Sequence, residues 1–286
     1  MPPTSILPKQ DAELDLTVVI ICYNSAQLIV DNLSEVLHSR RWRSLVVDNN
    51  SAGDTITLLR QHFPADKLVL LPRNEGYGRA ANVVLGKLQT RYALLLNPDI
   101  IASEADITGF VEHARGQHPP AAIVAPATRP EEKTSTGMLE CDEVLGAAML
   151  FDQEQMRGIG WFDEQLFLYY EEKDLCRRAR QAGSRILQDS DHYLRHDKGT
   201  SSGSSERIAY LKQWHVGWSS CYYLNKHGLD RGRRSPWFML LRYSVKATLY
   251  YRDRGENLKY RARCAGVLAY IQGLAAFDAD GQPRAS

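Results

Sequence analysis

The chain of 286 residues has few cysteines and no arrangement of them that would build a site. Its five cysteines are scattered, odd in number and without a C-x-x-C pair: Cys22, Cys141, Cys176, Cys221 and Cys264. A disulfide framework and a thiolate zinc site are therefore not expected. A reducing cytoplasm is the predicted compartment.

Long hydrophobic runs and a dominant charge are also lacking. The N-terminal stretch MPPTSILPKQDAELD has no apolar core of signal-peptide length, and no run reaches membrane-spanning length, so neither secretion nor membrane insertion is expected. The 35 Lys and Arg nearly balance the 34 Asp and Glu, so no global field would recruit nucleic acid. With 44% hydrophobic and 24% charged residues, the chain suits one large globular domain, or one domain with an appendage.

Glycine-rich phosphate loops are missing as well. No G-x-G-x-x-G follows the first apolar run and no G-x-x-x-x-G-K-[ST] occurs, which disfavours dinucleotide-binding and P-loop proteins. What the first hundred residues do contain is an alternation of apolar runs, the first of them the β-branched LTVVIICY, and helical patterns. Strands are expected at 16–23, 44–51, 67–72 and 91–99, with helices around 28–37, 55–62 and 78–88. This order predicts an α/β fold with a mostly parallel sheet flanked by helices.

Polar residues follow the end of each of these four strands. They are Tyr23 and Asn24, Asp48 and Asn49, Arg73 and Asn74, and Asn97 and Asp99. Any one of them alone is explained by turn formation. Four strand ends in a row instead favour a ligand site, because parallel strands end at one edge of a sheet.

The second half has a less regular pattern. A strand is expected at 144–151, a short edge strand at 184–190, a polar loop at 126–137, a mobile Gly/Ser-rich loop at 196–207 and an aromatic helix at 207–227. Between them, FLYYEEKDLCRR places Glu171 beside Glu172. One interpretation is a helix start, where Glu171, Glu172 and Asp174 face the positive end of the macrodipole.

From about Leu16 to His227 the chain resembles the inverting nucleotide-sugar glycosyltransferases of family 2, which have the GT-A fold, and most closely their bacterial rhamnosyltransferase-like members. The resemblance rests on motifs in a fixed order: VVIICYNS, VVDNNSAGDT, PRNEGYGRAANVVLG, LLLNPD, VLGAAMLF, GWFDEQLFLYYEEKDLCRR and H-x-x-G-x-S at His196, Gly199 and Ser201. It implies a catalytic domain over 15–230. Outside the resemblance, the Pro-rich, polar N-terminus predicts a flexible tail over 1–14, and 231–286 is expected to form a C-terminal helical, basic-aromatic extension. Within the catalytic domain, 15–130 would bind the nucleotide-sugar, and 131–230 would bind the acceptor and carry catalysis.

The resemblance also implies a donor site. Asp48 would accept the imide N–H of uracil or thymine, a bond that adenine could not make, and Tyr23 would lie against the base or ribose. Asn74 and Gly76 would let the chain approach the donor closely. The full donor set is Tyr23, Asn24, Asp48, Asn49, Arg73, Asn74, Gly76, Asn97, Asp99 and Asp142.

A divalent cation is expected at the diphosphate. Asp99 resembles the metal-binding acid of the D-x-D signature, whose first acid is replaced here by Asn97. His196 is implied as a second ligand. Oxygen ligands suit Mg²⁺ or Mn²⁺, and an imidazole shifts the preference somewhat toward Mn²⁺.

Catalysis is implied at the acid pair. Glu172 aligns with the family's catalytic base, with Glu in place of Asp, and would take the acceptor's proton, while Glu171 would hold a loop amide or an acceptor hydroxyl. Two crowded carboxylates raise one pKa, which suits a base near neutrality. Asp174 is interpreted as a helix-start acid. Asp99 and Glu172 are expected to face each other across one cleft.

The acceptor side is implied at the G-[FW]-F-D-E segment, with Trp161, Asp163 and Glu164. Asp142 resembles an acid that lines the sugar pocket, although Glu143 follows it where the family often has Trp. This departure leaves the identity of the sugar undecided.

The segment 231–263 places apolar residues at helical spacing, with basic residues around them. One interpretation is an interfacial helix on anionic lipid, which would bring the enzyme to a polyprenyl-linked acceptor at the inner face of the membrane. The other is a helix packed on the catalytic domain or on a dimer partner. Both stay open.

The predicted function is metal-dependent, inverting transfer of a sugar from a dTDP- or UDP-sugar to a saccharide or lipid-linked saccharide, with L-rhamnose as the best guess. Two alternatives remain. One is a sugar nucleotidyltransferase, which would want a Gly-rich basic loop that CYNSAQ lacks. The other is a nucleotide-sugar-binding subunit with impaired catalysis.

Overall fold

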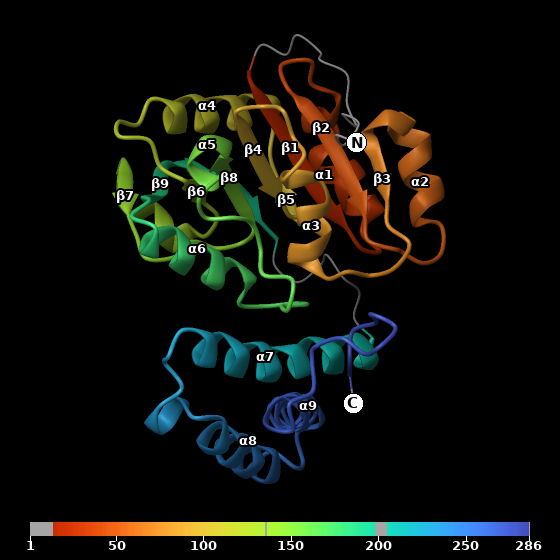
Figure 1. Ribbon diagram of the computed structural model, residues 1–286. Coiled ribbons are helices and arrows are strands. Elements are labelled where there is room, and N and C mark those ends of the chain that lie inside the picture. Colours follow the sequence, from red (N-terminus) through yellow and green to blue (C-terminus); the bar gives the residue numbers. More distant parts are fainter. Residues whose placement is uncertain (1–13, 135, 198–204, 286) are drawn as a thin grey trace, which may run out of the picture. The chain divides into compact units, whose positions relative to one another are not determined.

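The computed structural model describes residues 14–134, 136–197 and 205–285, which form two compact units (Figure 1). Unit 1 comprises the described part of Met1–Arg73, together with Ala80–Phe162 and the described part of Leu175–Ser202. Unit 2 comprises Asn74–Arg79, Asp163–Asp174 and the described part of Gly203–Ser286. Both units combine segments far apart in sequence, so the boundary expected near residue 230 is not where the compact units divide.

Unit 1 is built on an eight-stranded sheet among the described residues, in the order β3-β2-β1-β4-β8-β6-β9-β7. Its strands are β1 (Leu16–Cys22), β2 (Arg43–Asp48), β3 (Leu68–Leu70), β4 (Tyr92–Leu96), β6 (Ile123–Ala127), β7 (Met138–Glu140), β8 (Ala148–Asp152) and β9 (Ile186–Tyr193). The strands β3, β2, β1 and β4 run parallel, as does β9 beside β6, whereas β8 and β7 pair antiparallel. The predicted α/β fold with a mostly parallel sheet is confirmed.

The predicted alternation of strands and helices is confirmed over the first hundred residues. Helices α1 (Ala26–His38), α2 (Thr55–His62) and α3 (Tyr77–Leu85) follow β1, β2 and β3. Every residue of β1 is buried, as a β-branched run in a sheet covered on both faces should be. Its side chains join those of α1 and β4 in one apolar core that includes Val18, Leu33 and Leu94.

The second half departs from the prediction in two places. The segment 184–190 was expected to form an edge strand, but β9 lies between β6 and β7 inside the sheet. The expected loop 126–137 begins inside β6 and continues in a 3₁₀ turn, η2 (Pro130–Thr134). Most of the expected mobile loop at 196–207 lies outside the described residues.

Several elements have no counterpart in the sequence prediction. They are β5 (Ile100–Ile101), α4 (Glu104–Arg115), α5 (Gln153–Met156) and the strands β6 and β7. Helix α4 begins with a capping box, in which the Ser103 hydroxyl accepts from the Asp106 N–H and the Asp106 carboxylate accepts from the Ser103 N–H.

Unit 2 is largely helical. Its helices are α7 (Glu206–Lys226), η3 (Gly232–Arg234), α8 (Pro236–Leu249) and α9 (Arg254–Ile271). Glycines let α7 and α9 cross closely, since a Cβ at Gly217 would lie 2.3 Å from the Arg263 carbonyl and one at Gly266 would lie 2.0 Å from the Trp214 carbonyl. The segment 231–263 contains helix α8 and the first part of α9. Asp253 caps the start of α9.

Two short segments complete unit 2. Residues 74–79 pack on residues 163–174, where Tyr77 donates its N–H to the Phe167 carbonyl at 3.1 Å. Gly76 has a φ of +80°, and a Cβ there would lie 2.1 Å from the same carbonyl oxygen. The glycine is required by this backbone contact within the protein. No described helix is long and apolar enough to cross a membrane.

Candidate active site

The carboxyl edge of the parallel strands in unit 1 carries several of the predicted donor residues. Asp48 ends β2 opposite Cys22 of β1, and its side chain is buried. One carboxylate oxygen, Oδ2, accepts the Ser51 N–H at 3.1 Å. The other, Oδ1, is buried and has no hydrogen-bond partner among the described residues. Because an unpaired buried carboxylate oxygen is costly, this atom is a ready acceptor for a ligand N–H.

The residues around Asp48 fix the loops at this edge. Asn24 has a φ of 54°, and its side-chain oxygen accepts the Ala52 N–H at 2.8 Å. Asn49 is buried and donates its N–H to the Cys22 carbonyl at 2.8 Å. Tyr23, which precedes Asn24, is half-buried. Asn24 and Asn49 therefore hold the loops that follow β1 and β2.

Asp99 and His196 meet in unit 1 although 97 residues separate them. The short strand β10 (Arg195–His196) pairs with β5, and Asp197 donates its N–H to the Asp99 carbonyl at 3.0 Å. This ladder brings His196 Nε2 to 3.1 Å from Asp99 Oδ1. The Asp99 side chain is only 2% exposed.

The ligand atoms of Asp99 and His196 fit a divalent cation. A buried carboxylate and an imidazole nitrogen can both coordinate one ion, and the remaining positions would be left to water or phosphate oxygens. Asn97, which donates its backbone N–H to the Ala147 carbonyl at 2.8 Å, is half-buried beside them. Gly199 and Ser201 of the H-x-x-G-x-S motif lie outside the described residues.

The polar end of β3 has a local role. Arg73 is half-buried, and the Asn74 side-chain oxygen accepts the Gly76 N–H at 3.0 Å, which closes a turn. Asp142, in contrast, lies at the surface of unit 1. Its side chain is 79% exposed and pairs with Arg180 at 2.9 Å, which gives no support to a role in lining a sugar pocket.

The acid pair opens α6 (Glu171–Gln181). The preceding residues, Tyr169 and Tyr170, have φ values of 66° and 70°, a conformation that is rare for bulky residues and that turns the chain sharply into the helix. Glu171 is 6% exposed, and its Oε2 has no partner among the described residues. Burial, reinforced by the charge of the half-buried Glu172, raises the pKa of Glu171 well above its ordinary value.

The raised pKa therefore lies on the first acid of the pair. A carboxyl with a raised pKa tends to hold its proton, and a protonated Glu171 would relieve the repulsion on Glu172. The sequence pattern showed that two acids were crowded. It did not show which one would be buried.

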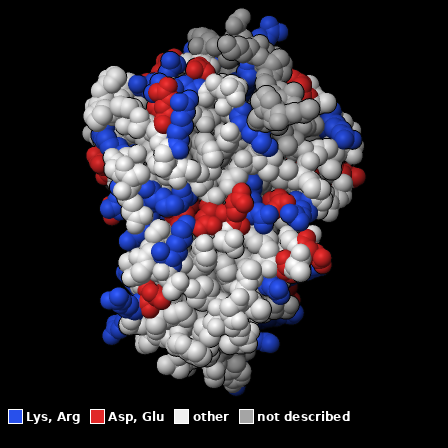
Figure 2. Space-filling view, viewed as in Figure 1, with Lys and Arg blue, Asp and Glu red and all other residues white. Residues whose placement is uncertain are grey.

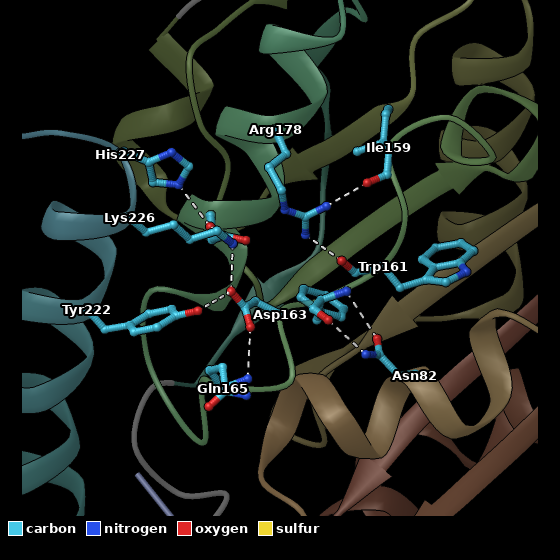
Figure 3. A network of polar contacts seen from close by, with 11 residues as sticks. Asn82, Ile159, Trp161, Asp163, Gln165, Arg178, Tyr222, Lys226 and His227 are labelled. Atoms are coloured by element: carbon cyan, nitrogen blue, oxygen red, sulfur yellow. Dashed lines mark hydrogen bonds and ion pairs between the residues drawn. The ribbon is translucent and has the colours of Figure 1, made fainter. Parts of the chain in front are cut away.

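Asp163 is fully engaged within unit 2 (Figure 3). Its carboxylate accepts from the Tyr222 hydroxyl at 2.9 Å, the Lys226 ammonium at 2.6 Å and the Gln165 N–H at 2.8 Å. Burial alone would raise the pKa of Asp163, but these bonds, that of Lys226 foremost, outweigh it and lower the pKa. Asp163 thus holds its loop to α7, whereas Glu164 is exposed.

Asp174 has a larger role than a helix-start acid. Its side chain is fully buried and receives Lys226 Nζ at 2.6 Å and His227 Nε2 at 2.9 Å, both from the end of α7. Sequence reasoning missed Lys226 and His227, which carry no motif and lie over fifty residues away.

Trp161 belongs to a separate network in unit 1 (Figure 3). Arg178 donates to the carbonyls of Ile159 and Trp161, and Asn82 bonds both the N–H and the carbonyl of Phe162. The Trp161 ring packs edge-on against Phe151. Asn82 was not singled out, although it closes the N-x-G-[FY]-x-x-A-x-N motif.

Comparison with known proteins agrees with this architecture. A low-salt glycan biosynthesis hexosyltransferase, Agl10 of Haloferax volcanii, is 26% identical over 206 residues, which are 61% of this chain. The chain spans 64% of that relative's length.

Solved structures share the fold at low identity. The mannosyltransferase PcManGT from Pyrobaculum calidifontis, in complex with GDP-Man and Mn²⁺, has a TM-score of 0.61 at 14% identity and covers 95% of this chain and 91% of its own. TarS of S. aureus, residues 1–349 in complex with UDP-GlcNAc, has a TM-score of 0.55 at 15% identity and covers 91% and 92%. Residues 17–177 match the model of the family Glycosyl transferase family 2. This chain therefore belongs to glycosyl transferase family 2.

Proposed function

We propose that the chain transfers a sugar, with inversion and with a divalent metal, from a pyrimidine nucleotide-sugar to a hydroxyl of a saccharide or lipid-linked saccharide in cell-surface polysaccharide or glycolipid synthesis. The observation that carries the proposal is the buried Asp99 carboxylate facing His196 Nε2 at 3.1 Å. In this proposal 15–130 bind the donor, and 131–230 bind the acceptor. The donor sugar we propose is L-rhamnose from dTDP-L-rhamnose.

The donor base would be recognised at Asp48. Its free Oδ1 would accept the imide N–H of thymine or uracil, while Tyr23 lies against the base or ribose. PcManGT and TarS, which share the fold, are solved with GDP-Man and UDP-GlcNAc, so a sugar nucleotide as donor is supported by both. Asn24, Asn49 and Asn74 would keep the surrounding loops in the shape that admits it.

The cation would be held by Asp99 and His196. These two residues would place Mn²⁺ or Mg²⁺ where its charge would offset that of the diphosphate leaving group. PcManGT and GalNAc-T7, a further structure with a TM-score of 0.55, both contain Mn²⁺. Asn97 and Arg73 would add neutral and positive donors to the phosphate oxygens.

Glu172 would act as the base that takes the proton from the acceptor hydroxyl. The support is electrostatic. Glu171 is buried beside it with a raised pKa, so Glu171 tends to hold its proton and then does not repel the Glu172 carboxylate. Trp161 and Glu164 would contribute to the acceptor side, and Asp163 would position the loop that carries Glu164. Asp142 remains a proposed residue of the sugar pocket, without structural support.

Two measurements test the proposal. In a thermal-shift panel of dTDP, UDP, GDP and ADP, each with and without Mn²⁺, only the pyrimidine nucleotides should raise the unfolding midpoint. Mn²⁺ should increase this rise in wild type, and Asp99→Ala should abolish it. A response to GDP instead would refute the assignment of the base. An absence of any nucleotide response would refute the donor site.

A transfer assay tests the base. Glu172→Gln should lower the transfer rate by at least about 100-fold, the contribution typical of general-base catalysis. The control is Glu112→Gln, an exposed acid on α4 that pairs with Arg41 at 3.6 Å and should leave the rate unchanged. Transfer by Glu172→Gln at the wild-type rate would show that the base is elsewhere. Transfer by neither wild type nor variant, with the nucleotide response intact, would favour an impaired binding subunit.

We further infer a peripheral membrane contact through 231–263. Trp237, Leu241, Val245 and Leu249 follow one another at four-residue spacing on α8 and are 49% to 72% exposed. The opposite side of α8 is occupied, because Met239 and Tyr243 are buried with Tyr260 of α9. In the face shown in Figure 2, the surface over α8 and α9 is mostly uncharged, with Lys and Arg at its margins.

An apolar ridge with basic residues nearby suits anionic lipid better than a purely apolar partner. Exposed basic residues in this segment are Arg231, Arg233, Arg234, Arg242, Arg252, Arg254 and Arg261. The purified chain should bind anionic liposomes at low salt, and Leu241→Ser with Leu249→Ser should reduce binding about tenfold or more. Leu139→Ser, at an exposed leucine of β7, is the control. A wild-type dimer that dissociates in the double variant, without liposome binding, would refute the membrane contact.

A further inference from the structure

Two histidines and an aspartate meet in unit 1, on elements that the transfer site does not use. His113 lies on α4, and Asp189 and His192 lie on β9. Asp189 Oδ2 is 3.0 Å from His113 Nδ1 and 2.8 Å from His192 Nδ1. Asp189 is fully buried, whereas the two imidazoles are 32% and 29% exposed. The three ligand atoms lie within 4.8 Å of one another.

A bulge in β9 produces this arrangement. Asp189 pairs with Pro126, but the next pair in the ladder is Tyr193 with Ala127, so residues 190–192 are additional on the β9 side. In a regular strand, residues three apart point to opposite faces of the sheet. Here Asp191 donates its N–H to Asp189 Oδ1 at 3.0 Å, and the turn carries His192 back over Asp189. Bulges of this kind commonly re-aim a side chain at a functional site.

The neighbouring helix leaves room for the second imidazole. A Cβ at Gly109 of α4 would lie 3.1 Å from His192 Nε2. A larger residue there would press against the ring. The rings of His113 and His192 consequently lie 5.2 Å apart, with their Nδ1 atoms turned to the same carboxylate oxygen.

We propose that His113, Asp189 and His192 form a second divalent cation site, of the Zn²⁺ type, that ties α4 to the bulge of β9. Two imidazoles and one carboxylate are a ligand set of three-ligand zinc sites, in which water takes the fourth position. Ligands about 2.1 Å from one ion lie about 3.0–3.4 Å from each other, close to the N–O distances of 2.8 and 3.0 Å found here. The partial exposure of both rings gives an ion a path in and leaves a side for water.

The site differs chemically from the pair Asp99 and His196. Two imidazoles favour Zn²⁺, while one carboxylate with phosphate oxygens favours Mn²⁺ or Mg²⁺. The two are linked along the chain, since β9 continues into β10 and His196 follows His192 by four residues. A cation at the second site would therefore restrain the segment that presents His196. This consequence rests on the proposed function, whereas cation binding itself does not.

The test uses the full chain, stripped of metal with a chelator and dialysed. Co²⁺, a spectroscopic stand-in for Zn²⁺, is titrated into wild type, Asp99→Ala, His192→Gln and His113→Gln, and the visible absorption bands of bound Co²⁺ are followed. Asp99→Ala, which lacks the Asp99 ligand, should take up one equivalent, and wild type should take up at least one and show the same bands. His192→Gln and His113→Gln should bind at least about tenfold more weakly. His62→Gln, which alters an exposed histidine on α2, should behave as wild type.

Folding of each variant is checked by circular dichroism before titration. If His192→Gln does not fold, His113→Gln, whose side chain is on a helix surface, carries the comparison. A second readout is the rise in the thermal unfolding midpoint on adding Zn²⁺ to wild type and Asp99→Ala. Absence of both Co²⁺ bands and a Zn²⁺-dependent rise in Asp99→Ala would overturn the proposal. So would unchanged binding in the folded His113→Gln variant.

Discussion

A buried histidine in unit 2 should make this protein sensitive to mild acid. His215 on α7 is fully buried, with its ring 4.5 Å from that of Phe167 and 4.8 Å from that of Trp214. Burial lowers the pKa of His215 from 6.5 to about 3, and the backbone of Arg284 opposes the shift only in part. The folded state therefore requires the neutral imidazole.

The sign of the effect follows from the two pKa values. The unfolded chain takes up a proton near pH 6.5 and the folded chain only near pH 3, so stability from this group is complete above about pH 6.5 and is lost as the pH falls toward 3. At about 1.4 kcal/mol per pH unit, the loss is about 2 kcal/mol between pH 7 and pH 5. The full loss approaches about 4–5 kcal/mol near pH 3.

Native-state hydrogen exchange of the α7 amides measures this directly. Wild type and His215→Leu are compared at pH 7, 6 and 5, because leucine removes the titrating group and keeps an apolar side chain. The opening free energy of α7 should fall with acid by about 2 kcal/mol more in wild type than in the variant. His62→Leu, at an exposed histidine, is the control and should follow wild type. Equal pH dependence in wild type and His215→Leu would refute the reasoning.

Three further changes have defined expectations. Gly76→Ala forces a Cβ to within 2.1 Å of the Phe167 carbonyl oxygen at a φ of +80°, so it should destabilise the protein by at least about 3 kcal/mol in urea unfolding. Glu171→Gln mimics the protonated acid. Because the pKa of Glu171 is raised in the folded state, wild type loses stability as the pH rises above 4.5. The variant should therefore gain stability relative to wild type over the same pH range. Lys226→Met leaves the buried Asp174 carboxylate with one partner fewer and should cost about 3 kcal/mol.

The changes at Gly76 and Lys226 each have a matched control. Gly158→Ala meets nothing within 4 Å and should be neutral or slightly stabilising. Arg254→Met breaks an ion pair with Glu206 whose side chains are 88% and 58% exposed, and its effect on stability should be negligible. A Lys226→Met variant as stable as Arg254→Met would mean that Asp174 is solvated. A constant stability difference between Glu171→Gln and wild type across pH would mean that Glu171 is ionised in the folded state.

Local sequence patterns were sufficient to predict an element where the residues of a segment favour one kind of secondary structure. The apolar runs at β1, β2 and β4 are almost entirely buried, as strands of a sheet covered on both faces are, so the α/β fold followed from them. The convergence of Asp48 with the end of β1 followed in turn, because parallel strands share an edge. Where β9 would fall in the sheet did not follow, since strand order depends on long-range pairing.

The same limit applies to the site. Sequence motifs identified Asp99, His196, Glu171 and Glu172 as chemistry-bearing residues, and the family relationship gave them roles. Only the tertiary structure decided that Glu171 is the buried acid of its pair, because burial depends on what packs over the helix start.

Sequence alone determined the fold class, the family and the edge of the sheet that carries the polar residues, because these depend on composition and on spacings of a few residues. Tertiary structure alone decided that Asp163 and Asp174 share Lys226, and that His113 of α4 meets Asp189 of β9. Hydrogen bonds and ion pairs between residues over fifty positions apart leave no local spacing to detect. The chain must fold before such charges can meet.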